Sequence, residues 1–400
     1  MAVYSRRSIF NVKRSDLIMP EVKKRRILHI VEAMGGGVFT YLVDLVNELC
    51  DEYDVYIAYA VRPQTPLDFK DYFDKRIKMI EVKNFSRRIN FCEDIKAFFE
   101  IKKIAEKIMP ETIHLHSSKA GILGRLAFHS NKTALFYTPH GYSFLMQDSG
   151  KVKRAIYKGI ETVVGGINPK CVTIACSKGE YEAGRKLTKK AAFVNNGIDI
   201  DSLGAVIETL EQNKKAGENQ YDAKSKPLTI FTSGRICYQK NPAQFNAIAE
   251  TFAKENSDIK FLWIGDGELR DTLTSKNIEI TGWVDRNQVL EHSMRGDVFL
   301  LTSLWEGLPI SLLEAMFMKK LCIVSNVIGN RDVIENEVNG FVCKNKTEFV
   351  RVIRNIGKWS FDSLIESAYD DILTVYNRKE MAKNYKKWYR KVHNDMKYKV

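Results

Sequence analysis

The sequence has no C-x-x-C pair, and its seven cysteines are an odd number that lies mostly within apolar runs. This usage is typical of a reduced cytosolic protein with core thiols and argues against a disulfide framework or a zinc site. No stretch reaches the roughly 18 consecutive apolar residues that a membrane span needs. The first residues, Met-Ala-Val-Tyr-Ser-Arg-Arg, lack the apolar core of a secretory signal. We therefore expect a cytoplasmic protein that can meet a membrane only peripherally, on the inner face of the cell membrane.

The sequence also lacks a short internal repeat, a low-complexity block and a complete G-x-G-x-x-G motif. The nearest approach to that motif is the glycine run 35–37, which follows the first expected strand. No acidic residue ends a well-placed second strand, so a dinucleotide site is only weakly indicated. Glycines before a helix still suit backbone contact with an anionic group, which makes Gly36 and Gly37 candidate ligand-binding residues.

Negative charge is scarce in the first half of the chain. Residues 1–200 hold 33 Lys and Arg against 22 Asp and Glu, a net +11, whereas residues 201–400 hold 29 against 27, a net +2. The asymmetry indicates a nucleic acid, an anionic membrane surface or a phosphate-carrying substrate, and a solvated basic face without a partner is an equal alternative. No recognisable nucleic-acid module is present, so we expect no nucleic-acid partner. The basic clusters run from Lys23 to Arg26, from Lys151 to Arg154 and from Arg185 to Lys190.

Apolar runs alternate with helical patterns along the 400 residues, which predicts two α/β domains with parallel, doubly wound, Rossmann-like sheets. We expect a basic extension at 1–24, a first domain at 25–204, a junction at 205–227, a second domain at 228–375 and a helix at 376–400 that can cross back to the first domain. The expected strands are 27–31, 55–60, 79–82, 113–116, 134–138, 172–176, 192–194, 228–232, 261–264, 278–281, 298–301, 321–324 and 341–343.

The segment Ser303-Leu-Trp-Glu-Gly-Leu-Pro-Ile-Ser-Leu-Leu-Glu314 carries the strongest signal for a ligand site. It places Glu306 in a loop after an expected strand and Glu314 on the helix that follows, with Pro309 expected in the first turn of that helix. In an open α/β sheet, ligands bind at this carboxyl edge of the strands. The free N–H groups of a helix start favour a diphosphate, and two carboxylates nearby suit the hydroxyls of a polyol. The segment therefore predicts a nucleotide-sugar site, although two glutamates on a solvated helix face are the alternative.

Two further strand-to-helix turns could line such a site. The segment Ser233-Gly-Arg-Ile-Cys-Tyr-Gln-Lys-Asn-Pro242 holds Arg235 and Lys240 between an expected strand that ends at Gly234 and a helix that starts at Pro242. Both cations suit phosphate oxygens. The turn Gly265-Asp-Gly267 permits close approach of a ligand to the backbone.

Three histidines and a D-x-D motif are further candidates for a site. His114 and His116 share one face of an expected strand, but no third ligand is apparent, so we expect no metal. His140 lies between Pro139 and Gly141 at a strand end, where a side chain can take part in binding or proton handling. The D-x-D at 199–201 is interpreted as a turn.

Taken together, these residues resemble the retaining glycosyltransferases of family 4, which have the GT-B fold with two Rossmann-like domains facing a central cleft. The resemblance covers roughly residues 25–375. Its most specific part is the Glu-x7-Glu motif of Glu306 and Glu314. The segments at 35–37, 196–199, 233–242 and 265–267 are also similar.

The resemblance implies a role for each matching residue. Arg235 and Lys240 would hold the donor diphosphate, Glu314 the ribose hydroxyls, and Glu306 the donor sugar. His140 would face the reacting sugar from the first domain. The backbone of Gly307 and Leu308 would donate N–H groups to the donor, and Gly36, Gly37, Gly234 and Gly265 would approach it closely. No metal is implied, because cations and helix N-termini can offset the charge of the leaving group.

One departure from the family pattern lies at Val327-Ile-Gly-Asn-Arg-Asp332, where family members often have a Gly-Gly pair and then Pro-Glu. This leaves the donor contacts of that segment open. The form in this chain resembles members that build bacterial surface polysaccharides.

We therefore expect a glycosyltransferase that moves a hexosyl or N-acetylhexosaminyl group, with retention, from a nucleoside diphosphate to a hydroxyl acceptor. A UDP-sugar is the expected donor and a lipid-linked saccharide the expected acceptor, with no separate cofactor. The alternatives are a UDP-sugar epimerase of similar fold and a non-enzymatic protein that binds anionic polymers.

Overall fold

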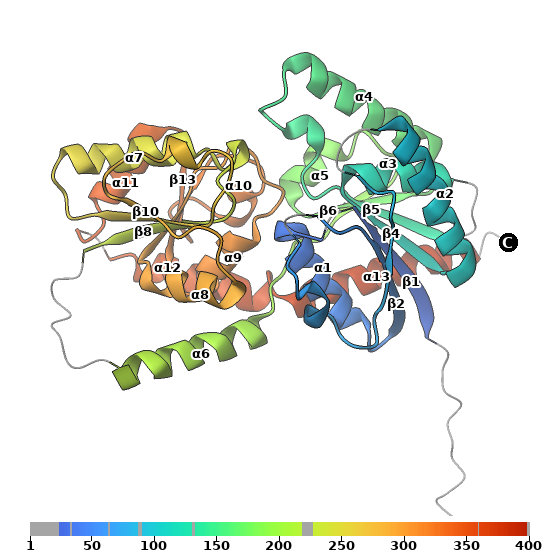
Figure 1. Cartoon of the computed structure of the whole chain (residues 1–400), viewed down its shortest axis with the longest axis horizontal. Coiled ribbons are helices and arrows are strands. Elements are labelled where there is room, and N and C mark those ends of the chain that lie inside the picture. The colour runs from blue at the N-terminus through green and yellow to red at the C-terminus, as the bar shows by residue number, and fades with distance from the viewer. Residues whose placement is uncertain are drawn as a thin grey trace, which may run out of the picture.

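The computed structural model describes residues 24–32, 34–62, 65–86, 90–129, 133–217, 227–358 and 360–397. The expected basic extension, apart from Lys24, lies outside the described residues, as does the later part of the expected junction. Two α/β domains lie side by side, each built on a twisted parallel sheet (Figure 1).

The N-terminal domain has a seven-stranded sheet in the order β3-β2-β1-β4-β5-β6-β7, in which every described pairing is parallel. Buried apolar runs form its central strands, as expected for a sheet that is covered on both faces. The strands are β1 (Arg25–Val31), β2 (Tyr53–Tyr59), β3 (Lys78–Glu81), β4 (Thr112–His116), β5 (Ala134–Thr138), β6 (Val172–Ala175) and β7 (Ala191–Phe193).

The C-terminal domain has a six-stranded parallel sheet in the order β10-β9-β8-β11-β12-β13. Its strand order reverses between β8 and β11, which is the switch point where open α/β sheets bind ligands. The strands are β8 (Thr229–Ser233), β9 (Lys260–Ile264), β10 (Ile278–Ile280), β11 (Val298–Leu301), β12 (Leu321–Ser325) and β13 (Phe341–Cys343).

Helices cover both faces of each sheet with apolar side chains. On the N-terminal sheet, α1 and α13 share one core with β1 and β2, whereas α2 and α3 pack on the opposite face. On the C-terminal sheet, α8, α9 and α12 pack on one face, and α7 and α11 on the other. The helices are α1 (Gly36–Leu49), α2 (Phe91–Ile108), α3 (Ser117–Ala127), α4 (Lys151–Ile167), α5 (Lys178–Gly184), α6 (Ile200–Gly217), α7 (Pro242–Lys254), α8 (Arg286–Arg295), α9 (Ile310–Phe317), α10 (Asn330–Val333), α11 (Lys346–Arg354), α12 (Asp362–Thr374) and α13 (Arg378–Lys397), with 3-10 turns η1 (Phe69–Tyr72), η2 (Ser143–Leu145), η3 (Tyr238–Lys240) and η4 (Arg270–Thr272).

The α/β fold class predicted from the sequence is confirmed, and each of the thirteen expected strands is present within one or two residues. Two local predictions were wrong. Pro309 is the N-cap of α9 and not part of its first turn, and either position leaves its missing N–H without consequence. The segment at 199–201 is not a turn, because Ile200 and Asp201 are the first residues of α6, and Asp199 accepts a hydrogen bond from the Ser202 N–H (3.1 Å) at the start of that helix.

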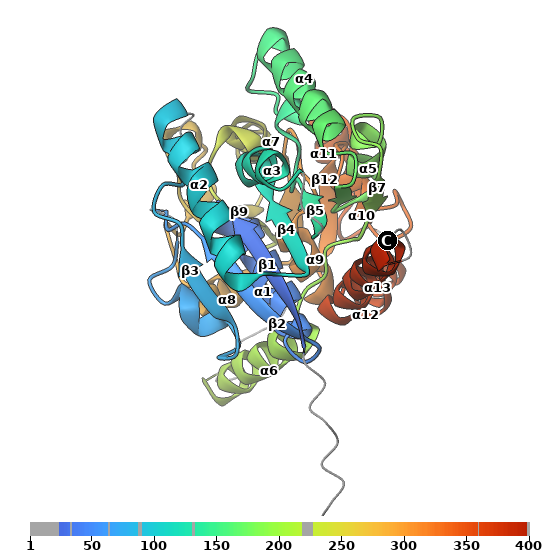
Figure 2. The ribbon, with the colours of Figure 1, turned by 90° about the vertical axis from the view of Figure 1, so that its right-hand side faces the viewer.

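The end of the chain returns to the N-terminal domain. After α12, the segment at Asn377 forms an isolated bridge with Ile198, and Arg378 makes ion pairs with Glu48 and Asp199. Helix α13 then lies along the N-terminal domain (Figure 2), where Tyr385 and Tyr389 are fully buried against its sheet.

Candidate active site

Glu306 lies in the loop after β11 and is buried beside Lys240. The Lys240 ammonium donates to Oε1 of Glu306 (Nζ···Oε1 2.7 Å), and the Ser303 hydroxyl donates to the same oxygen (2.7 Å). The Gln239 amide donates to Oε2 at 3.2 Å. Because three donors hold this carboxylate, its orientation is fixed before any ligand arrives.

The two turns that were expected to line the site meet through their backbones. Gly265 has a positive φ of 135°, and a Cβ there would lie 2.3 Å from the carbonyl oxygen of Gly234. Gly234 has a φ of 143°, and its carbonyl oxygen also accepts from the Trp263 indole at 2.9 Å. Arg235 points to Glu268 instead of Glu306, and its guanidinium is partly exposed in that ion pair.

Glu314, on α9, is paired with a residue that the sequence did not single out. The Arg286 guanidinium, at the start of α8, donates to Oε1 of Glu314 at 2.5 Å. Arg286 belongs to no recognisable sequence motif, so only the tertiary structure reveals its ion pair with Glu314. Among the residues that the structure describes, none donates a hydrogen bond to the second oxygen of Glu314, which leaves it to a hydroxyl group of a ligand.

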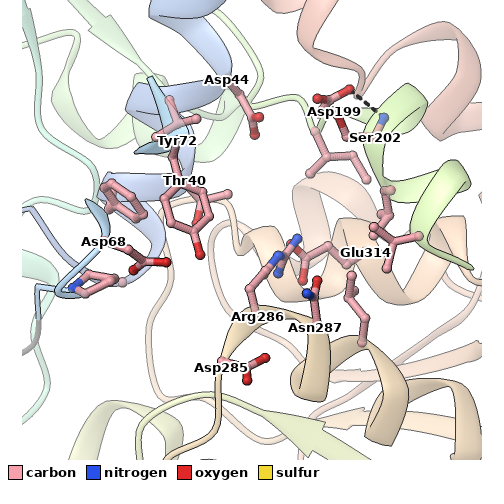
Figure 3. Close-up of a pocket in the computed structure, with 18 of the residues that line it drawn as sticks. Thr40, Asp44, Asp68, Tyr72, Asp199, Ser202, Asp285, Arg286, Asn287 and Glu314 are labelled. Carbon is pink, nitrogen blue, oxygen red and sulfur yellow. Dashed lines mark hydrogen bonds and ion pairs between the residues drawn. The ribbon is translucent and has the colours of Figure 1, made fainter. Parts of the chain in front are cut away.

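A cavity of about 940 Å³ opens between the domains at this point (Figure 3). Its wall includes Gly36 and Asp44 from α1, and Arg286 and Glu314 from the C-terminal domain. Burial, and then repulsion by Asp199, raises the pKa of Asp44 well above its usual value. This volume is at the upper end of the range for small-molecule sites, which suits a ligand as large as a nucleotide-sugar.

The two domains touch beside Glu306. A Cβ at Gly307 would lie 2.9 Å from the Cys176 sulfur and 3.1 Å from the backbone nitrogen of Gly141, so only glycine fits. Nearby, the Asn196 amide donates to the carbonyl of Leu308 at 2.9 Å. Within the described residues, the N–H groups of Gly307 and Leu308 have no protein acceptor.

A second contact between the domains lies in the segment that departs from the family pattern. Oδ2 of Asp332 accepts from the backbone N–H of Gly179 across the cleft (2.9 Å) and from that of Gly329 (3.1 Å). Gly329 has a φ of 86°, and a Cβ there would lie 2.5 Å from the carbonyl oxygen of Gly307. The segment 327–332, which departs from the family pattern, therefore packs directly against the loop that carries Glu306.

His140 occupies the turn after β5 with a positive φ of 56°, a conformation that is uncommon for residues other than glycine. Its Nε2 lies 3.1 Å from Nδ1 of His116, and its ring packs edge-on against Tyr41. Burial lowers the pKa of His140 to about 3, so its ring is neutral at physiological pH.

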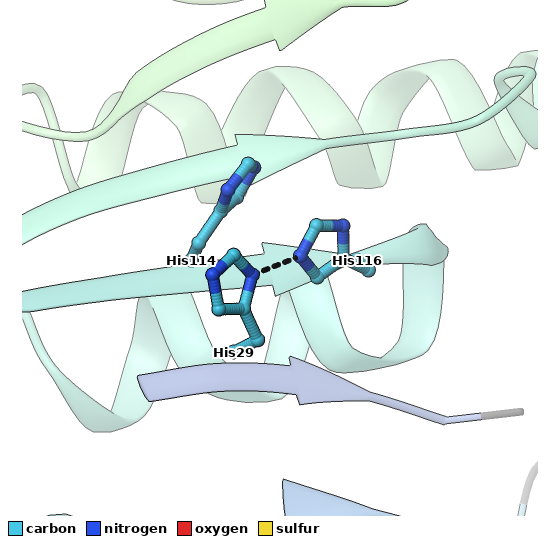
Figure 4. A group of neighbouring side chains, drawn as sticks. All are labelled: His29, His114 and His116. Atoms are coloured by element: carbon cyan, nitrogen blue, oxygen red, sulfur yellow. Dashed lines mark hydrogen bonds between the residues drawn. The ribbon is translucent and has the colours of Figure 1, made fainter. Parts of the chain in front are cut away.

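A row of histidines continues from His140 into the core. Figure 4 shows three of them, His29, His114 and His116. Nε2 of His116 lies 2.9 Å from Nδ1 of His29. The His114 ring forms hydrogen bonds with the Tyr389 hydroxyl through Nδ1 (2.7 Å) and with the Thr138 hydroxyl through Nε2 (2.9 Å). His29, His114 and His116 bring ring nitrogens within 4.8 Å of one another, a spacing that could hold a metal ion. Sequence reasoning missed His29 as a third ligand, because the contact arises from the pairing of β1 with β4. The absence of a metal stays a prediction.

The structure thus groups the expected residues unevenly. Lys240, Glu306, Gly307 and His140 gather where the domains touch, and Gly36 and Glu314 line the cavity. Arg235 is held away by Glu268, and Gly37 lies exposed on the first turn of α1.

Two family models match this chain, and together they span most of it. The model of Glycosyltransferase Family 4 matches residues 35–202, and that of Glycosyl transferases group 1 matches residues 190–360.

Curated relatives include two bacterial transferases. The chain is 31% identical, over 68% of its length and 72% of the relative's, to the Escherichia coli UDP-Gal:alpha-D-GlcNAc-diphosphoundecaprenol alpha-1,3-galactosyltransferase. It is 23% identical, over 90% of its length and 96% of the relative's, to the Campylobacter jejuni N,N'-diacetylbacillosaminyl-diphospho-undecaprenol alpha-1,3-N-acetylgalactosaminyltransferase.

Solved structures share the fold at low sequence identity. A sucrose-phosphate synthase from Thermosynechococcus elongatus has a TM-score of 0.76 at 15% identity, covering 93% of this chain and 100% of its own. Anabaena HepE in complex with UDP and glucose has a TM-score of 0.67 at 14% identity, covering 91% of this chain and 98% of its own. The two GT-B-like domains, the family models and the relatives agree, and the chain belongs to glycosyltransferase family 4.

Proposed function

We propose that the protein transfers a hexosyl or N-acetylhexosaminyl group from a UDP-sugar to a hydroxyl of a saccharide linked to a lipid diphosphate, with retention and without a bound metal. The proposal assigns a donor, an acceptor and a mechanism to the glycosyltransferase.

The observation that carries the proposal is the buried Lys240–Glu306 pair at the contact between the domains, with the 2.7 Å Nζ···Oε1 distance. A cation there would face the diphosphate, and the carboxylate would face hydroxyls of the sugar. His140, from the opposite domain, approaches the same point through the contact between Gly141 and Gly307. A sugar held between these groups would be screened from water on both sides.

Departure of UDP leaves negative charge on the β-phosphate, and the site has groups that would stabilise it. Lys240 and the N–H groups of Gly307 and Leu308 lie in one loop cluster, and Arg235 would join them by exchanging Glu268 for phosphate. Glu306 is assigned no role as nucleophile. Attack by the acceptor on the face that the phosphate leaves would retain the configuration.

The relatives support the choice of substrates. By name, one acts with UDP-Gal on a diphosphoundecaprenol-linked sugar, and another transfers N-acetylgalactosamine to a diphospho-undecaprenol saccharide. UDP-Gal and UDP-GalNAc are therefore the first donors to test.

A lipid-linked acceptor would require the enzyme to act at a membrane surface. We propose that this surface is the inner face of the cell membrane. None of the described helices is long and apolar enough to cross a bilayer. The +11 charge of residues 1–200, against +2 for residues 201–400, would favour an anionic surface.

The experiment that tests the proposal begins with thermal shift in EDTA, using UDP-Gal, UDP-GalNAc, UDP-Glc, UDP-GlcNAc and GDP-Man. Stabilisation by a UDP-sugar, followed by its transfer to a short-chain lipid-diphosphate saccharide with an α-linkage in the product, is the expected result. A shift that needs added Mg²⁺ or Mn²⁺ would contradict metal independence. Binding by GDP-Man alone would contradict the UDP assignment, and release of an epimerised UDP-sugar without acceptor would favour an epimerase.

A further inference from the structure

Helix α4 carries an apolar stripe on the side that faces solvent. Its members are between 37% and 75% exposed. At about 100° of rotation per residue, their Cα atoms fall within an arc of about 80°. The members are Val152, Ile156, Ile160, Val163 and Ile167.

The opposite side of the same helix is the one attached to the protein. Glu161 is buried there, and it accepts from the Arg125 guanidinium (2.7 Å) and from the Tyr137 hydroxyl (3.0 Å). Val164 and Gly165 are also buried, whereas most of the helix is not. An amphipathic helix normally turns its apolar side to the core of its own protein. The outward-facing stripe of α4 therefore indicates that a surface outside this chain packs against it.

The exposed charged side chains of α4 are the lysines Lys151, Lys153 and Lys158. Lys153 flanks the stripe at about 20° from its edge, whereas Lys151 and Lys158 lie on the other sides of the helix. The C-terminal part of the helix lies against the next basic cluster, because a Cβ at Gly165 would be 2.4 Å from the carbonyl oxygen of Leu187. That cluster contributes four more exposed cations, Arg185, Lys186, Lys189 and Lys190. The two basic runs therefore lie at the two ends of α4, about 20 Å apart along its axis.

We propose that α4 docks on an anionic lipid bilayer, with its apolar stripe among the acyl chains and its lysines at the headgroups. An apolar stripe beside exposed lysines is the pattern of helices that lie in the plane of a membrane surface. The only acidic residue of α4, Glu161, is buried and paired with Arg125, so the exposed charges of the helix are all positive. This suits an anionic surface better than a protein partner of mixed charge. Helix α4 projects from the N-terminal domain in both Figure 1 and Figure 2, so a flat surface can reach it.

Docking through α4 would place the contact between the two domains at Leu304 near the membrane. The helix starts four residues after Gln147, whose amide donates to the carbonyl of Leu304 in the C-terminal domain at 2.8 Å. The same connection contains the His140 turn. This geometric consequence rests on the proposed function, because it explains how a lipid-linked saccharide would reach Glu306.

Helix α2 offers a matched control. It also exposes apolar side chains, Phe91, Ile95 and Phe99, but its four acidic residues balance its four lysines. The test compares the double variant Ile156→Glu/Val163→Glu in α4 with Ile95→Glu/Phe99→Glu in α2. Circular dichroism first establishes that both variants fold.

Flotation with phosphatidylethanolamine vesicles, with and without phosphatidylglycerol, measures binding at low salt. The wild type and the α2 variant are expected to float with anionic vesicles and not with neutral ones, whereas the α4 variant loses about tenfold or more of its binding, since two buried apolar side chains become charges. Failure of the wild type to float, wild-type flotation of the α4 variant, or an equal loss in both variants would each overturn the proposal.

An activity assay separates this inference from the proposed function. The α4 variant should keep its transfer rate onto a short-chain acceptor in solution and lose it only on acceptor embedded in vesicles. Absence of transfer by the wild type in solution would defeat the proposed function and leave the flotation result standing.

Discussion

At the scale of single residues, Glu306 is held by Lys240, Ser303 and Gln239, so its neutral analogue fits the same space. We expect Glu306→Gln to lower kcat by about two to three orders of magnitude, because a group placed for the transition state loses its charge. The assay is product formation from labelled UDP-sugar, with thermal denaturation to establish folding. Glu291→Gln, in a surface ion pair with Arg295, is the matched control and should retain full activity. Wild-type turnover by Glu306→Gln would remove it from the site.

Lys240 serves both folding and ligand binding in our interpretation, and the two roles can be separated. Lys240→Met leaves the buried Glu306 carboxylate without its cation, which should destabilise the protein by about 3 kcal/mol. The double variant Lys240→Met/Glu306→Gln should recover much of that stability without recovering activity. Urea unfolding and donor KM are the measurements. If the double variant is as unstable as the single one, the ion pair is not what stabilises this loop.

At the scale of secondary structure elements, α13 acts as part of the N-terminal domain although it follows the C-terminal domain in the chain. Tyr389 is buried in the core of the N-terminal domain and its hydroxyl is 2.7 Å from Nδ1 of His114. We expect Tyr389→Ala to lower the free energy of unfolding by about 3–5 kcal/mol, since it leaves a large cavity. The exposed Lys387 of the same helix is the control, and Lys387→Ala should change stability by less than about 0.5 kcal/mol. Equal effects of both changes would show that α13 is not packed on the sheet.

The histidine row between β1 and β4 makes stability depend on pH. Burial lowers the pKa of His29 to about 3 and that of His116 well below 6.5, whereas unfolded histidine titrates near pH 6.5. Below that pH the unfolded chain binds more protons than the folded one, so the free energy of unfolding falls on acidification, by up to about 1.4 kcal/mol per pH unit for each histidine. Urea unfolding between pH 7 and pH 5 measures this slope. His29→Gln should flatten it, and an unchanged slope would contradict the assignment.

At the scale of the whole molecule, the contact at Gly307 is expected to control closure of the cleft. In Gly307→Ala the added methyl group would meet the Cys176 sulfur and the His140–Gly141 backbone. We expect each domain to stay folded, the radius of gyration with UDP to rise, and kcat to fall by about tenfold or more, because misplacement by about 1 Å is already costly. Small-angle scattering and steady-state kinetics measure the two effects. Gly166→Ala, where a Cβ meets nothing within 4 Å, is the control. An active, closed Gly307→Ala enzyme would refute this role.

Much of the architecture could be predicted because it is local. Each apolar run between turn residues became a strand, and alternation with helical patterns predicted parallel sheets, so the fold class followed from short-range information. The Glu306–Glu314 spacing was likewise visible in the sequence, since a strand, a turn and a helix that follow one another within residues 298–317 place both carboxylates at one sheet edge.

The amino-acid sequence by itself determined the fold class, the two domains, the loops that carry Lys240 and Glu306 and the helix that carries Glu314, because periodicity and turn chemistry act over a few residues. Only the tertiary structure decided that Arg286 pairs with Glu314, that Asp332 reaches Gly179 and that His29 joins the row of histidines. It also decided which side of α4 faces solvent, since an amphipathic pattern does not state which side packs on the protein. Each of these features joins segments far apart in the chain, and their contact depends on sheet order and domain closure, which no local pattern encodes.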